Sequence, residues 1–176
     1  MRKDAGGSAQ RYVVPDFPRL SPPALPRYRS TMPYMWADSL LAAEQAHLMR
    51  LVAWGAASVL AGTAILALLL RRADRSALLR HFAIQTASWG AIDLAIAAVA
   101  HRGLAVRDVA AATRLDRFLW LNIGLDVGYV MVGLTLAIAG WRMGRRLGLV
   151  GAGIGVVVQG TALALLDLLL AAYISR

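Results

Sequence analysis

The sequence contains no cysteine, a single lysine and few charged residues. The absence of cysteine excludes disulfides, thiolate metal sites, iron–sulfur clusters and cysteine nucleophiles. Of the 176 residues, 16% are charged and 59% are hydrophobic. A soluble domain is about 25% charged and about 45–50% apolar, so this chain could not cover its apolar surface with polar groups in water. The composition therefore predicts a membrane protein.

Proline is absent after Pro33, and all six prolines lie within residues 1–37. Because proline fixes φ and lacks an N–H donor, we interpret residues 1–37 as an extended tail rather than a helix or inner strand. Arginines are interleaved there with aromatic residues. A plain linker is poor in aromatic residues. The tail is interpreted either as disordered or as an arm that lies on partner subunits or lipid headgroups. The candidate partner-binding residues are Tyr12, Phe17, Tyr28, Tyr34 and Trp36.

Four apolar runs follow, each flanked by arginine: residues 51–70, 81–100, 118–141 and 147–173. Each is near the ~20 residues that a helix needs to cross a bilayer, which admits only helices or closed barrels. The sequence therefore predicts an all-α, integral membrane four-helix bundle over residues 51–173. Helical spacing over residues 38–50 predicts an interfacial helix with Asp38 as its N-cap, and residues 106–117 are a candidate for a second.

Four spans place both ends of the chain on one side of the membrane, here called side A. The two short loops on side B, residues 71–80 and 142–146, hold seven arginines and one aspartate, which favours side B as cytoplasmic. A long basic tail without a secretion signal favours the opposite orientation, so both stay open. The net charge of +9 is spread over these membrane flanks, which explains it without a nucleic-acid partner.

Polar side chains inside the apolar runs form the candidate site. They are Asp93, Asn122, Asp126, Tyr129, Gln159 and Asp167. A charge at membrane depth costs ~2.5–3.5 kcal/mol, so each carboxylate needs a structural or functional reason. At ~1.5 Å per residue, Asp93 and Asp126 lie ~12 Å and Asp167 ~9 Å from the side A ends of their helices. We therefore expect the carboxylates of three helices to meet in one buried polar cluster.

Small residues recur at spacings that let helices approach closely, because lipid supplies no hydrophobic force between helices. The expected packing positions are Ser58, Gly62, Gly124, Gly128, Gly133, Gly151 and Gly155. The glycines at 151, 153 and 155 do not predict a phosphate loop, because no strand precedes them and no lysine follows.

Three motifs carry a resemblance to a known family: Trp89-Gly90-x-x-Asp93, Asn122-x-Gly124-x-Asp126-x-Gly128-Tyr129, and Gly155-x-x-x-Gln159-Gly160 followed by Asp167. Their pattern resembles a small uncharacterised bacterial family of four-span membrane proteins. The resemblance covers roughly residues 80–170 and leaves out the tail. It implies a four-helix membrane fold and no particular activity.

Three roles for the polar cluster stay open: hydrogen bonds that fix helix register, a proton or cation site, and an intramembrane enzyme. The enzyme has the least support because no nucleophile and base are paired, and we expect no catalytic residues, metal ligands or cofactor. His81 and His101 are expected at the interfaces, and a single His47 or His81 could ligate a pigment. Arginines from side A could pair with the acids; they are Arg102, Arg107, Arg114 and Arg117.

The leading hypothesis is a non-catalytic accessory subunit of a larger complex in the bacterial inner (cytoplasmic) membrane. A bioenergetic complex, photosynthetic or respiratory, fits a chain in which no catalytic residues are evident. Its partners would be the lipid bilayer and other membrane subunits, with a bound pigment or lipid left open. The alternative is a small ion- or proton-coupled transporter that uses Asp93, Asp126 and Asp167.

Overall fold

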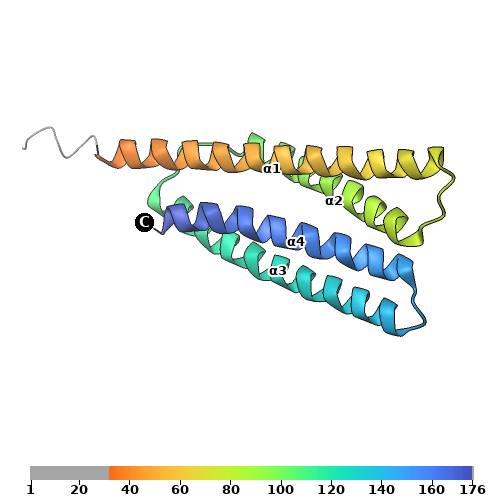
Figure 1. Cartoon of the computed structure of the whole chain (residues 1–176). Coiled ribbons are helices and arrows are strands. Elements are labelled where there is room, and N and C mark those ends of the chain that lie inside the picture. Colours follow the sequence, from red (N-terminus) through yellow and green to blue (C-terminus); the bar gives the residue numbers. More distant parts are fainter. Residues whose placement is uncertain (1–31, 176) are drawn as a thin grey trace, which may run out of the picture.

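The computed structural model describes residues 32–175, with side chains from Met35 onward. This part of the chain forms four helices and no strand: α1 (Met32–Arg71), α2 (Ala77–Arg102), α3 (Val109–Arg142) and α4 (Leu147–Ile174). All four are long and apolar enough to cross a membrane. The chain is therefore an all-α multi-pass membrane protein, and the predicted four-helix fold is confirmed (Figure 1).

Helix α1 is one continuous helix of 40 residues, so no boundary separates an interfacial helix from the first span. Because α1 begins at Met32, the prediction that residues 1–37 contain no helix is wrong for residues 32–37. Pro33 is tolerated because the first N–H groups of a helix have no intrahelical acceptor. Asp38 lies within the helix and is not its N-cap.

Helix α3 is also continuous over its 34 residues, so residues 106–117 do not form a separate interfacial helix. Asp108 caps it: its carboxylate accepts a hydrogen bond from the backbone N–H of Ala111 at 2.7 Å. At the start of α2, the Ser76 hydroxyl accepts a bond from the N–H of Leu79 in the same way, at 3.3 Å. Such caps satisfy donors that the helix itself leaves free.

The four helices form two antiparallel hairpins, α1–α2 and α3–α4 (Figure 1). Helix α4 packs against α2 and, over a shorter length, against α1, whereas the backbone of α3 contacts only α4. The contact between α2 and α4 therefore holds the hairpins together, while the backbones of α2 and α3 are not in contact. The start of α1 and the end of α4 lie at the same end of the bundle, which is side A (Figure 1).

Side chains are distributed as expected for a protein in lipid. Large apolar residues on all four helices face outward, among them Leu60, Ile96, Met131 and Leu165. The largest fully buried side chains are Leu40, Gln159 and Asp93, two of which are polar. Since lipid solvates apolar groups and not polar ones, this arrangement agrees with four membrane spans.

Small residues let the helix backbones touch. A Cβ atom added to Gly90 of α2 would lie 2.6 Å from the carbonyl oxygen of Gly55 in α1. In the same way, a Cβ atom added to Gly62 of α1 would lie 2.6 Å from the carbonyl oxygen of Ala83 in α2. Gly133 of α3 and Gly153 of α4 face each other in the same way. The expected packing role is confirmed at Ser58, Gly62, Gly133, Gly151 and Gly155.

Two glycines of α3 do not have the packing role that the sequence predicts. Nothing lies within 4 Å of a Cβ atom added to Gly124 or Gly128, so the prediction that they pack α3 against a neighbouring helix is wrong. They share a helix with Gly133 but lie on its exposed side. The spacing of glycines alone does not tell which face of α3 meets α4.

Candidate functional site

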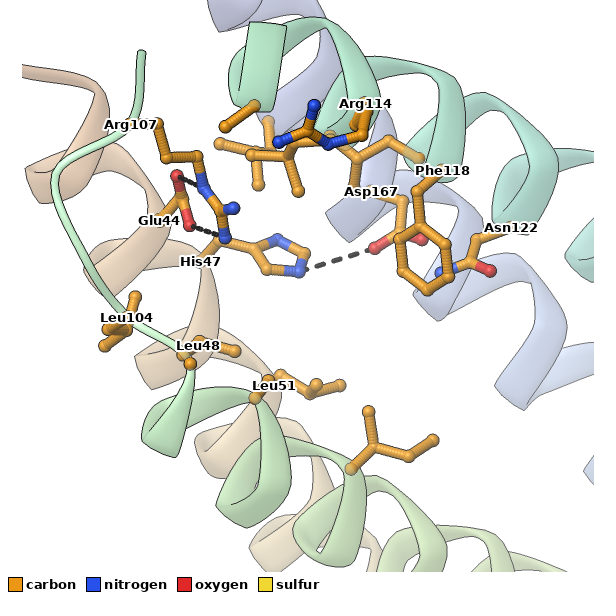
Figure 2. Close-up of a pocket in the computed structure, with 17 residues that line it drawn as sticks. Glu44, His47, Leu48, Leu51, Leu104, Arg107, Arg114, Phe118, Asn122 and Asp167 are labelled. Atoms are coloured by element: carbon orange, nitrogen blue, oxygen red, sulfur yellow. Dashed lines mark hydrogen bonds and ion pairs between the residues drawn. The ribbon is translucent and has the colours of Figure 1, made fainter. Parts of the chain in front are cut away.

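Two adjoining cavities occupy the side A half of the bundle. The outer cavity, about 410 Å³, lies beside the loop of residues 103–108, and the inner cavity, about 390 Å³, lies deeper and between α2 and α3. Both are lined by Leu51, Ile96, Asn122 and Asp167, so these four residues lie where the two cavities adjoin. Figure 2 shows the outer cavity, with charged side chains on one part of its wall and leucines on another.

An ion pair ties α1 to the loop at the rim of the outer cavity. The Arg107 guanidinium donates from Nε to Oε1 of Glu44 at 2.6 Å and from Nη2 to Oε2 at 2.9 Å. The Glu44 carboxylate is only 5% exposed, and its hydrogen bonds raise the pKa of Arg107 above the usual value. Because paired charges of this geometry hold both side chains in place, the pair fixes the loop against α1.

A second polar contact crosses the outer cavity from α1 to α4. Nε2 of His47 lies 3.4 Å from Oδ1 of Asp167 (Figure 2). His47 is 8% exposed, and its other ring nitrogen, Nδ1, has no hydrogen-bond partner. Asp167 also lines the inner cavity, so this contact lies where the two cavities meet.

Behind the wall of the inner cavity, a chain of hydrogen bonds links three helices. The Trp54 indole N–H of α1 donates to Oε1 of Gln159 in α4 at 2.7 Å, and Nε2 of Gln159 donates to Oδ2 of Asp93 in α2 at 3.4 Å. Asp93 is completely buried, yet its Oδ1 has no partner. Buried polar atoms are nearly always paired, so a free carboxylate oxygen on a cavity wall calls for an explanation.

Asp126 of α3, only 6% exposed, completes the inner cavity together with Asp93 and Asp167. At the end away from side A, the rings of Trp89 and Tyr129 meet edge-to-face with centroids 5.2 Å apart. This aromatic pair lies where α2 and α3 have no backbone contact.

The structure brings the six predicted polar residues to one place. Five of them line the inner cavity: Asp93, Asn122, Asp126, Tyr129 and Asp167. Gln159 lies behind this wall and bonds to Asp93. The three acids therefore line a shared space.

The side A arginines do not form the ion pairs with these acids that the sequence left open. In the described part of the chain, Arg107 pairs with Glu44, and no ion pair joins an arginine to Asp93, Asp126 or Asp167. Arg114 lines the outer cavity only.

The candidate partner-binding residues are mostly beyond the described chain. Tyr12, Phe17 and Tyr28 lie outside the described residues, and Tyr34 belongs to the first turn of α1. Trp36 is 42% exposed and lines a hollow together with Val109 of α3 and Ile174 of α4. This end of the expected arm therefore lies beside the protein's own helices.

The roles of Glu44 and of the contact between His47 and Asp167 were not predicted from the sequence. Glu44 and His47 lie on one face of α1 with the buried residues Leu40 and Leu51. Spacings of four, three and four residues along this face are the signal that could have revealed them.

The arrangement suits binding through carboxylate oxygens. Within residues 32–175, no three His, Asp or Glu side chains gather closely enough to hold one metal ion. The acids are spread along a cavity instead, where they can accept protons, hydrogen bonds or the positive charge of a larger ligand.

The fold and the cavities define a four-span membrane protein with an acidic interior site. The chain belongs to a family of unknown function, DUF6992, whose match covers residues 50–168. The expected membership of an uncharacterised family is thereby confirmed, over a longer stretch than the motifs indicated. No curated protein and no solved structure matches the chain.

Proposed function

We propose that the protein is a small ion- or proton-coupled membrane transporter that binds its coupling ion at Asp93, Asp126 and Asp167. The observation that carries this proposal is the free Oδ1 atom of Asp93, which is completely buried on the wall of a cavity shared with two further acids. Carboxylates with a purely structural role would be expected to have their oxygens paired. Ionisable residues within spans commonly mark ion or proton pathways.

The two adjoining cavities offer a path for the ion. From side A, the outer cavity leads past His47 to Asp167 and Asn122, which also line the inner cavity with Asp93 and Asp126. Toward side B, the two hairpins meet closely where Gly151 of α4 lies against the backbone of Leu78 in α2. A binding site near mid-membrane that is reached from one side is what one state of an alternating-access transporter requires.

We expect Asp126→Asn to abolish ion-coupled flux while the protein still folds. Purified protein is reconstituted in vesicles containing a pH-sensitive dye, and an imposed membrane potential drives proton movement. The expected loss is at least tenfold, because the amide keeps the shape of the carboxylate but lacks its negative charge and does not take up a proton. Asp38→Asn, on an exposed position of α1 outside both cavities, is the matched control and should keep the wild-type rate.

The result that would contradict the proposal is equally specific. If the triple variant with asparagine at positions 93, 126 and 167 moves ions at the wild-type rate, the carboxylates have a structural role. Elution volume and helical content of each variant show whether a loss of flux reflects a loss of fold.

A second candidate function is that of an accessory subunit in a complex of the bacterial inner membrane. It is supported by Gly124 and Gly128, which are exposed on α3 although all other glycines within the described helices have close neighbours. Two glycines four residues apart allow another helix to approach closely in lipid. A partner helix seated there would cover this side of α3.

Sizing after gentle solubilisation of native membranes tests this second candidate. A subunit elutes with a complex much larger than the 18.9 kDa chain, and Gly128→Leu should release it by blocking the close approach. Val127→Leu, also exposed on α3 but outside the row of residues 124, 128 and 132, is the control and should stay in the complex. Migration of the wild-type chain as a lone bundle would rule out the subunit role.

A further inference from the structure

We propose that the inner cavity binds a lipophilic organic cation, a single positive charge carried on an apolar, aromatic-sized body. The inference rests on the proposed transporter function, since it uses the same carboxylates, and it names the class of substrate.

The sign of the charge follows from the lining of the inner cavity. Three aspartates line it, and no lysine, arginine or histidine does. The basic side chains nearby lie outside it: His47 contacts Asp167 from the outer cavity, and Arg107 is paired with Glu44. The free Oδ1 of completely buried Asp93 supplies an acceptor that no protein group uses. An anion would meet repulsion here, whereas a cation would meet unpaired acceptors.

The remaining lining indicates the body that carries the charge. Apolar walls formed by residues such as Ile92, Leu125 and Leu163 face the edge-to-face pair of Trp89 and Tyr129. Aromatic rings attract a cation and also pack against apolar groups. The volume of about 390 Å³ lies in the range of small-molecule sites and is far larger than a proton or bare metal ion needs.

Access to the inner cavity favours a ligand that dissolves in lipid. The backbones of α2 and α3 are not in contact, and the cavity reaches the outer surface between them at Ile92, Leu125 and Tyr129, which are 46%, 52% and 40% exposed. These positions lie within the apolar spans. A ligand with an apolar body can therefore enter sideways from the bilayer, while the outer cavity, which carries Glu44, His47 and Arg107, serves small ions from side A.

Binding of tetraphenylphosphonium to the purified full chain in a mild detergent tests the inference directly. Equilibrium dialysis with the radiolabelled cation should show saturable binding of one cation per chain. Tetraphenylborate, an anion of the same shape, is the matched probe and should show no saturable binding. Equal saturable binding of both ions would overturn the inference, because the site would then recognise shape and not charge.

Substitutions locate the binding in the cavity. Asp93→Asn and Asp126→Asn should each weaken binding of the cation at least tenfold, and Asp38→Asn should leave it unchanged. Since variants of buried acids could fail to fold, Leu125→Trp provides an independent test: it fills the cavity from a lipid-exposed position. Its matched control is Val127→Trp, on the same helix, 54% exposed and outside both cavities.

Loss of binding in Leu125→Trp but not in Val127→Trp supports the inference, and equal binding by both refutes it. A wild-type protein that shows Asp126-dependent proton flux but no binding of tetraphenylphosphonium would refute the substrate class and leave the transporter proposal standing. Charge-selective binding without any ion flux would support the cavity as a cation site and contradict the transporter.

Discussion

Replacing Gly151 by alanine is expected to separate the two helical hairpins. Gly151 of α4 lies directly against the backbone of Leu78 at the start of α2, so that an added Cβ atom would overlap the Leu78 carbonyl oxygen. A backbone group cannot rotate away as a side chain can, so α2 and α4 must move apart. Because α2 and α4 form the main contact between the hairpins, we expect a loss of about 3 kcal/mol or more in the free energy of unfolding.

Gly128→Ala is the matched control for this effect. Nothing lies within 4 Å of a Cβ atom at position 128, and alanine favours helix over glycine by about 1 kcal/mol, so this variant should be as stable as the wild type or slightly more stable. Unfolding in mixed micelles with increasing SDS, followed by circular dichroism, measures both. Equal stability of the two variants would show that the contact between Gly151 and Leu78 does not hold the hairpins together.

The number and position of the helices could be predicted because a bilayer leaves few choices. Arginines flank apolar runs of about 20 residues or more, and a helix is the structure that satisfies the backbone of such a run in lipid. The extents of α1 and α3 could not be predicted in the same way. Residues 38–50 and 109–117 carry enough charge to indicate a separate element, yet nothing in them breaks the helix, so α1 and α3 continue beyond the membrane-spanning part.

The meeting of the three aspartates could be predicted because they lie at similar depths in their helices. Asp93, Asp126 and Asp167 lie in apolar runs where each is conspicuous, and the rise of a helix is enough to compare their depths. The Glu44–Arg107 pair could not be predicted, since its partners are 63 positions apart and one lies in a loop. Charged residues outside the spans are common, so sequence offers no means to choose which ones pair.

Gln159→Leu is expected to destabilise the bundle by about 2–4 kcal/mol, because Gln159 serves two buried groups at once. Its Oε1 accepts the Trp54 indole N–H at 2.7 Å, and its Nε2 donates to Oδ2 of Asp93 at 3.4 Å. Leucine removes both bonds and leaves the completely buried Asp93 carboxylate without any donor from a side chain. The same substitution at exposed Gln45 of α1 is the matched control and should change stability by no more than about 0.5 kcal/mol.

A double-mutant cycle with Asp93→Asn separates the contribution of the carboxylate from that of packing. If the bond to the carboxylate causes the loss, Gln159→Leu should be milder by about 1 kcal/mol or more when residue 93 is asparagine, because no charge is then left buried. A loss of equal size in both backgrounds would assign the effect to the shape of the side chain or to Trp54 alone. In that case Asp93 would not depend on Gln159, and its position on the cavity wall would be set by the contact between Gly55 and Gly90, which holds α2 against α1.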